Sequence, residues 1–360
     1  MITIATLGSH SALDICRGAK DEGFRTLVVA QKGRETTYGS VYKTRRGIGC
    51  VDECLVLPHF KDILDFKVQK RLLDKQIIFV PHRSFEVYLD FDYERIEKHF
   101  RIPMFGNRFL LKIEERGRHP NQYDILAGAN IRFPRQFSDP KEIDRLCLVK
   151  VLEGARGFER AFFLVRNFAE YQREVRRKLK QGIFTHDQLG RAVIEEYVVG
   201  VQVNFNFFYS PISNRLELLG TDTRRQTNIE GIGNIPVSHQ QDVLLHVSLK
   251  YEEAGHVAVT VLESLLEDAF AIGERFVMAT KKLFKHGIIG PFSLQAVITP
   301  GPPKKEIIVI DVSPRMPGSP GIAATPYSAY LFGKPVSMGR RIAMEIKGAI
   351  RDNAVQKIMT

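Results

Sequence analysis

The chain has 360 residues, of which 44% are hydrophobic and 26% charged, and its formal net charge is +11. This length and composition predict two or three globular domains that need no disulfide framework. No uncharged apolar run reaches the roughly 18 to 20 residues of a membrane span, and the N-terminus lacks the pattern of a signal peptide. We therefore expect a cytoplasmic protein without a membrane partner.

The basic residues and the cysteines indicate neither a nucleic-acid interface nor a metal centre. Lys and Arg are spread along the chain, and their short runs at 43–46, 176–178 and 302–306 lack the interleaved aromatics of an RNA-binding sheet. The one close cysteine pair, Cys50 and Cys54, has no second pair or histidine couple to complete a tetrahedral site. A solvated surface, or pockets for phosphorylated metabolites, explains the charge better than a nucleic-acid partner.

The first hundred residues alternate short apolar runs with helix-length segments or loops. The runs are rich in β-branched residues and cover positions 2–7, 26–30, 54–57 and 77–80. Such a pattern predicts a parallel sheet with right-handed crossovers, which binds ligands at the carboxyl ends of its strands. After residue 107 the pattern changes, and residues 108–130 are polar with little periodicity.

A small polar tetrapeptide, Gly8-Ser9-His10-Ser11, lies between the first run and a helical segment that ends near Gly23. A helix N-terminus attracts anions such as phosphate, and His10 adds a titratable donor beside it. The alternative is that Ser9 or Ser11 only caps the helix while His10 packs locally. This stretch by itself leaves both interpretations open.

A second loop is expected at the same edge of the sheet. The fourth apolar run continues into "PHRSF", which places His82 and Ser84 where the chain turns from strand to helix. Two such loops can face one ligand.

A cation interrupts an apolar strand in the middle of the chain. Residues 146–165 read as a hairpin around a turn at 154–157, and Lys150 lies in its first strand. A buried ammonium group needs a counter-charge, so Lys150 either reaches solvent or meets an anion. Two adjacent carboxylates, Glu195 and Glu196, lie ahead of the next β-rich run.

A second hairpin brings two polar residues together near the C-terminal end. Its strands flank a Pro/Gly turn, and cross-strand partners whose numbers sum to about 605 place Gln295 nearly opposite Asp311. Polar side chains that face each other in a buried sheet need a shared partner, and an oxygen-ligated cation such as Mg²⁺ is one candidate. The alternative is a hydrogen-bonded Gln/Asp pair. A final helix is expected to start near Ser337.

These parts together resemble the ATP-grasp ligases, and within them the archaeal formate-dependent ligases of purine biosynthesis called PurP. The segments that carry the resemblance occur in the same order over nearly the whole chain: "TIATLGSHSAL", "GAKDEGF", "VPHRSF", "PMFGNR", "VKVLEGARG", "IEEYVVG", "FYSP", "TNIEGIGNIP", "IIGPFSLQ" and "PYSAYLFGKPVSMGRRIAMEIK". The resemblance implies an α/β ATP-grasp fold with a parallel-sheet, Rossmann-like preATP-grasp domain at 1–106. It also implies a central subdomain at 107–200, which carries a phosphate-covering hairpin, and a C-terminal subdomain at 201–360.

The resemblance also implies an enzyme of IMP biosynthesis with ATP and Mg²⁺ (or Mn²⁺) as cofactors. Family members use ATP to join formate to the amine of AICAR (5-amino-4-imidazolecarboxamide ribotide), which yields the formamido nucleotide FAICAR, ADP and phosphate. ATP would convert formate, a poor electrophile, into formyl phosphate, from which the amine displaces phosphate. Members of the family are homo-oligomers, so we expect a homo-oligomer.

The resemblance assigns site residues by position. Contacts to AICAR are implied for Gly8, Ser9, His10, Ser11, Ser84 and Asn228, and residues 8–11 are expected to receive its ribose-phosphate half. Contacts to ATP are implied for Lys150, Gly154, Arg156, Gly157, Glu195, Glu196, Tyr197 and Val198. Metal ligation is implied for Gln295 and Asp311, and catalytic roles for His10, Lys150 and Arg315.

The chain departs from the family's pattern at the parts that contact phosphate. The glycine-rich covering loop has Phe158 and Ala161 in place of two glycines, and Asp124 stands near the position of a second phosphate-contacting lysine. Asp311 is one methylene shorter than the usual Glu, and "SPRMPGSPG" lacks the Thr-Asn that completes the metal site. The alternative function is therefore a divergent nucleotide-binding PurP paralogue that has lost ligation and acts as a regulatory or partner subunit.

Overall fold

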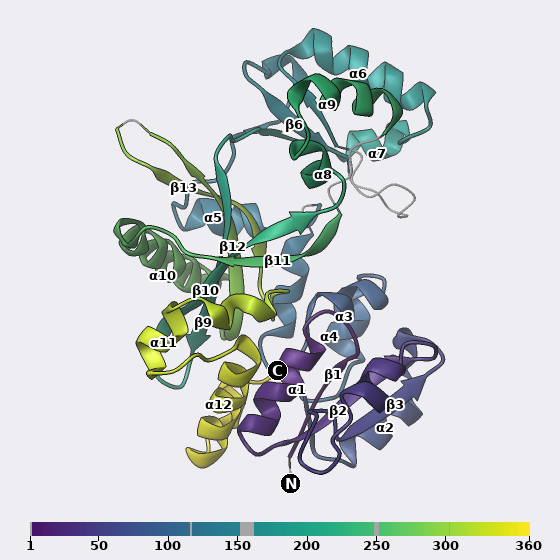
Figure 1. Cartoon of the computed structure of the whole chain (residues 1–360), viewed down its shortest axis with the longest axis vertical. Helices are drawn as coiled ribbons and strands as arrows, with labels where there is room; N and C mark the ends of the chain where they lie inside the picture. The colour runs from purple at the N-terminus through teal and green to yellow at the C-terminus, as the bar shows by residue number, and fades with distance from the viewer. Residues whose placement is uncertain (1, 116, 152–161, 248–251, 302) are drawn as a thin grey trace.

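The structure is a computed structural model that describes residues 2–115, 117–151, 162–247, 252–301 and 303–360. Three sheets with their helices make up this part of the chain (Figure 1). The N-terminal sheet lies at one end of the molecule, a five-stranded sheet in the middle, and a smaller sheet at the other end (Figure 1). No helix in the described ranges is long and apolar enough to cross a membrane.

The N-terminal sheet has four parallel strands in the order β3-β2-β1-β4. Its elements are β1 Thr3–Leu7, α1 Ala12–Asp21, β2 Arg25–Gln31, β3 Glu53–Leu57, α2 Phe66–Leu73, β4 Ile77–Phe79, α3 Arg83–Tyr88 and α4 Tyr93–Lys98. The four predicted strands are confirmed to within one residue at each end. Their β-branched runs are buried because helices and loops cover the sheet. The helix after the first strand ends as predicted, with Gly23 in the left-handed region at φ +88°.

The smaller sheet is antiparallel, with strand order β5-β8-β6-β7. Its elements are β5 Gln136–Phe137, β6 Cys147–Lys150, β7 Phe162–Val165, α6 Phe168–Lys180, α7 His186–Gly190 and β8 Val193–Glu196. The predicted hairpin is confirmed by the pairing of β6 with β7, in which Lys150 lies opposite Phe162. The turn of this hairpin, with Gly154, Arg156 and Gly157, lies outside the described residues.

The five-stranded sheet is antiparallel, with strand order β11-β10-β9-β12-β13. Its elements are β9 Val201–Ser210, β10 Arg215–Gln226, α8 Ile229–Gly233, α9 Val237–His246, β11 Glu253–Val259, α10 Leu266–Leu283, β12 Gly290–Thr299, β13 Glu306–Ser313, α11 Tyr327–Phe332 and α12 Met338–Arg351. The predicted register is confirmed: Gln295 pairs with Asp311, and a bulge follows between Gln295 and Ala296. The predicted final helix is α12. The Ser337 side chain caps its N-terminus by accepting the backbone N–H of Arg340.

Residues 108–130, which show little periodicity, contain ordered structure. A 3₁₀ segment at Arg108–Glu114 and the helix α5, Gln122–Gly128, pack their apolar side chains into the core under the five-stranded sheet. Short elements bury too few residues for a period to show in the sequence. The three sheets fall within the predicted ranges 1–106, 107–200 and 201–360, and the boundaries of those ranges stay a prediction.

Two glycines let the last helix lie directly on the first. A Cβ on Gly18 of α1 would lie 2.1 Å from the backbone nitrogen of Arg340, and one on Gly339 of α12 would lie 2.2 Å from the carbonyl oxygen of Asp14. The backbones therefore touch, and an ion pair of 2.9 Å between Arg340 and Glu22 supports the contact. This packing fixes the start of α1, and with it the loop after β1, relative to the C-terminal sheet.

Candidate functional site

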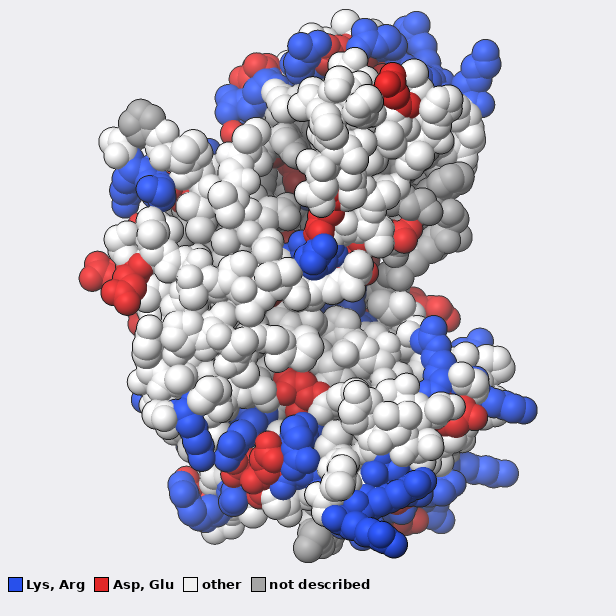
Figure 2. Space-filling view, viewed as in Figure 1, with Lys and Arg blue, Asp and Glu red and all other residues white. Residues whose placement is uncertain are grey.

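Three loops meet where the N-terminal sheet faces the five-stranded sheet. They follow β1, β4 and β13 and comprise residues 8–11, 81–84 and 314–319. Ser11 Oγ donates to the carbonyl oxygen of Pro317 at 2.8 Å, and His82 forms a β-bridge with Met316. The molecule is hollowed between its upper and lower parts (Figure 2). The prediction that the first two loops share an edge is confirmed, because β1 and β4 are hydrogen-bonded neighbours.

His10 occupies a strained backbone position at the centre of these loops. Its φ is 49°, and its ring stacks on that of His82 with centroids 5.5 Å apart. Ser11 Oγ gives its only proton to Pro317, so it accepts from Nδ1–H of His10 at 2.9 Å. His10 therefore carries its proton on Nδ1 and has a lone pair on Nε2.

The electrostatic surroundings keep the His10 ring neutral. The ring retains solvent-accessible surface, but its partial burial in the cleft, followed by the nearby His82 and Arg315, lowers the pKa of His10 well below its usual value. The titratable donor expected at this position is therefore uncharged, and it donates from Nδ1 to Ser11. Ser11 stands at the N-cap position of α1 without a side-chain cap bond, so the part of the alternative in which Ser11 caps the helix is wrong. The part in which His10 only packs locally stays a prediction.

His82 and Ser84 join the loop after β4 to the loop after β1. His82 is fully buried, accepts the N–H of Ser84 on Nδ1 at 3.3 Å and donates from Nε2 to the carbonyl of Leu7 at 2.9 Å. Burial lowers the pKa of His82 to about 4, so it is a neutral structural group. Ser84 Oγ donates to Ser9 Oγ at 3.0 Å, which brings Ser9, His10 and Ser84 together as predicted.

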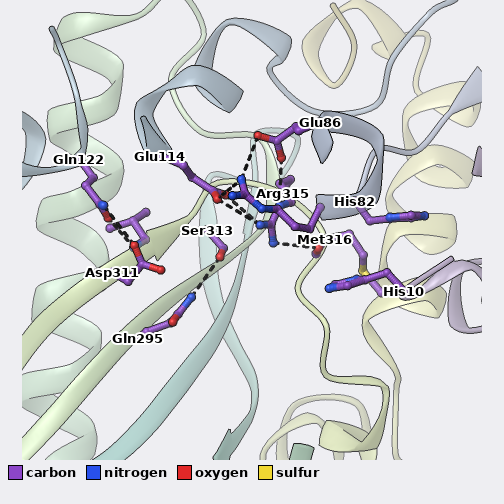
Figure 3. A network of polar contacts seen from close by, with 12 residues as sticks. His10, His82, Glu86, Glu114, Gln122, Gln295, Asp311, Ser313, Arg315 and Met316 are labelled. Carbon is purple, nitrogen blue, oxygen red and sulfur yellow. Dashed lines mark hydrogen bonds and ion pairs between the residues drawn. The ribbon is translucent and has the colours of Figure 1, made fainter. Parts of the chain in front are cut away.

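Arg315 anchors a buried group of charges between the two sheets (Figure 3). Its Nε lies 3.2 Å from an oxygen of Glu86, and its Nη2 lies 3.0 Å from an oxygen of Glu114. Arg83 also contacts Glu114, at 2.6 Å. The predicted catalytic Arg315 is therefore held in one orientation by carboxylates from α3 and the 3₁₀ segment, neither of which the sequence pattern singles out.

Glu86 titrates unusually within this group. Burial, and then the neighbouring Glu114, raise the pKa of Glu86 to about 7, against the opposing attraction of Arg315 and Arg83. Tyr93 donates its hydroxyl to the second oxygen of Glu86 at 3.1 Å. Whenever Glu86 holds a proton, the guanidinium groups of Arg83 and Arg315 share the single negative charge of Glu114. The buried group of charges is then net positive.

Gln295 and Asp311 face one another on the same side of the hairpin (Figure 3). Gln295 donates to Ser313 Oγ at 3.2 Å, and Asp311 accepts from the amide of Gln122 at 3.1 Å. No group of three or more His, Cys, Asp or Glu side chains able to hold a metal occurs in the described part of the chain. An amide oxygen and a carboxylate suit Mg²⁺, which takes its remaining ligands from phosphates and water.

Lys150 does not reach solvent. Only 7% of it is exposed, and its ammonium pairs with Glu195, which is 3% exposed on the neighbouring strand β8. Tyr123 donates its hydroxyl to the other oxygen of Glu195 at 2.8 Å. Glu195 thus supplies the counter-charge, and the two residues, for both of which the resemblance implies a contact to ATP, are adjacent.

The residues after Glu195 form the connection to the five-stranded sheet. The N–H of Glu196 donates to Arg135 at 2.8 Å, and that of Tyr197 donates to Leu146 at 2.9 Å. The Tyr197 side chain is 43% exposed, and Val198 is partly buried. Asp124, near the expected second lysine, is committed to a capping box with Asn121 at the start of α5.

Asn228 follows the end of β10 by two residues and precedes α8 with φ 39°. The helix α8 lies in the upper part of the molecule, and α1 and α3 lie in the lower part (Figure 1). The structure therefore gathers Ser9, His10, Ser84 and Arg315 in the cleft, while Asn228 stands at the end of β10.

Sequence reasoning missed a third histidine at the site, His256, and the buried carboxylate of Asp222 that holds it. Asp222 of β10 is 1% exposed and accepts from Asn206 at 2.6 Å, from Ser319 at 2.9 Å, from Asn204 at 3.0 Å, and from Nδ1 of His256. Burial alone would raise the pKa of Asp222, but these bonds, that from His256 first, hold it below its usual value. Asp222 is therefore an ionised anchor for three strands and the loop after β13.

His256 is the charged histidine of the site. Its Nδ1–H donates to Asp222 and its Nε2–H to Glu253 at 2.8 Å. Burial opposes protonation, but the bonds to these carboxylates outweigh it and raise the pKa of His256 to about 9. The chain offered no local signal for this pair, because 34 residues separate its members.

Three comparisons with known proteins agree with this architecture. A family described as "Domain of unknown function (DUF1297)" matches residues 170–360, and one described as "Protein of unknown function (DUF1246)" matches residues 4–137. The 5-formaminoimidazole-4-carboxamide-1-(β)-D-ribofuranosyl 5′-monophosphate synthetase of Methanobrevibacter smithii is 38% identical over 100% of this chain and 94% of its own. That of Methanopyrus kandleri is 38% identical over 100% of this chain and 95% of its own.

Solved structures are similar over the whole chain as well. The IMP biosynthesis protein PurP from Thermococcus kodakaraensis has a TM-score of 0.73 and 29% identity, covering 99% of this chain and 100% of that one. An ADP complex of N5-carboxyaminoimidazole ribonucleotide synthetase, at 11% identity, has a TM-score of 0.60 over 93% of this chain and 78% of that one, and shows the fold alone. The fold is an α/β ATP-grasp fold, as predicted.

Proposed function

Because the chain belongs to the family of 5-formaminoimidazole-4-carboxamide-1-(β)-D-ribofuranosyl 5′-monophosphate synthetases, or PurP, we propose that it is an ATP-dependent ligase of purine biosynthesis. It would join formate to the amine of AICAR and release FAICAR, ADP and phosphate. The observation that carries this proposal is the match at 38% identity over the full chain. The substrates are small molecules, and the enzyme would work in the cytoplasm as a homo-oligomer.

The reaction requires formate to become an electrophile. A formate oxygen would attack the γ-phosphorus of ATP, which breaks the bond to ADP and forms formyl phosphate; the AICAR amine would then attack the formyl carbon and expel phosphate. Lys150, with Glu195 to Val198, is proposed to bind ATP, together with Gly154, Arg156 and Gly157. Arg315 is proposed to stabilise the charge on the transferring phosphoryl group, since Glu86 and Glu114 hold its guanidinium in place.

Gln295 and Asp311 are proposed to hold Mg²⁺ or Mn²⁺. Their oxygen donors fit a hard cation, and Gln122 and Ser313 orient the two side chains. Such a cation would neutralise negative charge on the phosphates of ATP. The two protein ligands leave room for phosphate oxygens and water.

The nucleotide is proposed to bind at Ser9, His10 and Ser84. The lone pair on Nε2 of the neutral His10 suits an N–H or O–H donor of AICAR, for which a charged imidazolium would have no acceptor. Gly8 and Ser11 shape this loop: a Cβ on Gly8 would lie 2.7 Å from the Tyr38 ring. Asn228 stays a proposed contact at the end of β10.

The test is a direct assay of FAICAR formation. The full chain is incubated with ATP, Mg²⁺, formate and AICAR, and FAICAR and ADP are quantified by chromatography and mass spectrometry. We expect equal amounts of both products, with none when any substrate is left out. AICAR binding by calorimetry without any FAICAR or ADP would contradict the ligase and establish the nucleotide-binding paralogue instead.

A further inference from the structure

A buried carboxylate beside the cleft shares a hydroxyl with a second carboxylate nearer the surface. The Glu86 side chain on α3 is fully buried, and Oη of Tyr93 on α4 lies 3.1 Å from its Oε2. The same Oη lies 3.4 Å from an oxygen of Glu115, which directly follows the 3₁₀ segment and is partly exposed. Tyr93 has one hydroxyl proton, so it donates to one of these carboxylates at a time. The three side chains therefore have room for one further proton.

The two directions of the Tyr93 hydroxyl match two charge states of Glu86. When Glu86 is ionised, Tyr93 donates to it. When Glu86 carries a proton, it donates that proton to the Tyr93 oxygen, and Tyr93 donates to Glu115. A proton from solvent reaches this second state when Glu115 passes it to the Tyr93 oxygen while Tyr93 gives its own proton to Glu86. Only O–H bonds change, and Glu115 ends as the carboxylate it was before.

The groups that face Glu86 determine what the added proton does to the cleft. They are Arg83 on its own helix, Tyr93 on α4, Glu114 on the 3₁₀ segment and Arg315 after β13, with Glu115 and Arg118 beyond Tyr93. The two guanidinium groups and two carboxylates cancel while Glu86 is ionised, and one net positive charge remains once it is protonated. Burial and Glu114 raise the pKa of Glu86 to about 7, so both charge states occur near neutral pH.

Arg315 is the member of this group that lies next to the cleft loops. It stands between the two carboxylates and the histidines of the loops after β1 and β4 (Figure 3). Its Nε and Nη2 donate to Glu86 and Glu114, whereas Nη1 reaches, among the described residues, only the carbonyl oxygen of Met316 at 3.5 Å. An anion beside Arg315 meets a guanidinium that its partners neutralise while Glu86 is ionised. The anion is attracted more strongly once Glu86 is neutral.

We propose that Glu86 takes up a proton, relayed by Glu115 and Tyr93, when a phosphate group binds beside Arg315. This proposal rests on the proposed function for the identity of the anion, which is the γ-phosphate of ATP. Anion binding and protonation strengthen one another, because linkage between two binding events is reciprocal. Glu86 touches neither substrate nor cofactor, so it is a positioning residue that sets the charge around Arg315.

Calorimetry of Mg·ATP binding in two buffers with different enthalpies of ionisation counts the protons that are taken up. At about pH 7.5 we expect the wild-type chain to take up roughly half a proton more than Glu86→Gln, whose amide does not titrate. The ATP affinity of the wild type should fall about tenfold between about pH 6.5 and 8.5, whereas that of Glu86→Gln should stay nearly constant. Protons bound by ATP itself are common to both proteins and cancel in the difference.

Tyr93→Phe tests the relay and keeps the buried ring. It should lose most of the added proton uptake, because a protonated Glu86 then has no hydroxyl oxygen to which it can donate. Glu94→Gln is the matched control on the same helix, since the Glu94 side chain is 72% exposed and pairs with Lys98. This control should take up as many protons as the wild type.

Equal proton uptake in the wild type and in Glu86→Gln would overturn the proposal, and so would wild-type uptake in Tyr93→Phe. If Glu86→Gln fails to fold, Tyr93→Phe still decides the question. The readout is ATP binding and not FAICAR formation. ATP binding with this proton uptake but without FAICAR would refute the ligase and keep Glu86 as the proton acceptor, whereas FAICAR formation without the uptake would do the reverse.

Discussion

Gly318 and His10 are in direct contact across the cleft: a Cβ on Gly318 would lie 2.7 Å from Nε2 of His10. The residue after β13 that touches the loop after β1 must therefore be small if Nε2 is to meet a substrate. This contact joins the N-terminal sheet to the C-terminal sheet at the proposed nucleotide site. Its consequence can be tested by adding a single methyl group.

Gly318→Ala should weaken AICAR binding by about tenfold or more, because the methyl group would occupy the space at His10 Nε2 and lie near His256. Gly321→Ala is the control, since a Cβ there would meet nothing within 4 Å. Calorimetry gives the affinities and thermal unfolding gives the stability. Equal AICAR affinity in both variants would contradict the location of the site.

His10→Asn should weaken AICAR binding by roughly tenfold with little change in melting temperature. Asparagine tolerates the positive φ of 49° at this position, so the substitution removes the ring acceptor without adding backbone strain. His82→Asn provides the contrast, because it removes a fully buried ring that bridges two loops and should lower the melting temperature. A large loss of stability in His10→Asn would show that His10 only packs locally.

Lys150→Met should abolish FAICAR formation and reduce the free energy of unfolding by about 3 kcal/mol, because Glu195 would keep a buried charge without its ammonium partner. The double variant Lys150→Met with Glu195→Gln should regain most of that stability, since the amide still accepts from Tyr123. Urea unfolding and the FAICAR assay separate the two effects. Activity in the double variant would show that Lys150 serves stability only.

Asp311→Asn should raise the Mg²⁺ concentration needed for half-maximal activity by about tenfold or more while the melting temperature stays unchanged. The amide oxygen can still accept from Gln122, but it carries no charge for the cation. The measurement is FAICAR formation across a Mg²⁺ titration, and complete removal of Mg²⁺ by a chelator should stop the reaction in both proteins. An unaltered Mg²⁺ dependence would exclude Asp311 as a ligand.

The stability of the chain should fall as pH rises through about 9. Folding raises the pKa of His256 from 6.5 to about 9. The folded state therefore keeps a proton that the unfolded chain releases above pH 6.5. The contribution of the His256 proton to the free energy of unfolding is fully present below pH 6.5 and is lost as pH passes 9. This contribution is at most about 3 kcal/mol.

His256→Gln should flatten this part of the pH profile, which urea unfolding at several pH values would measure. The charged groups that face His256 are Asp222, Glu253 and Arg224, and they stay in place in the variant. The rest of the pH dependence, including that of Glu86, is common to both proteins and cancels in the difference. Identical profiles would show that His256 is not charged in the folded state.

The local features of the chain follow from its sequence alone. The β-branched runs predicted the four parallel strands, Gly23 predicted the end of α1, and Ser337 predicted the start of α12. The register of Gln295 with Asp311 also followed from counting outward from the turn. Each of these depends on backbone preferences or on side-chain periodicity within a few residues, which a sequence displays directly.

The partners of the charged side chains depended on the tertiary structure. The sequence left open whether Lys150 reaches solvent or meets an anion, and only the structure shows that it pairs with Glu195. The sequence contains no indication that Asp222 holds His256. The proton on His10 lies on Nδ1 because Ser11 donates to Pro317, 306 positions away. Hydrogen bonding and desolvation act through space, so the charge of a cleft residue is set by neighbours that only folding brings within reach.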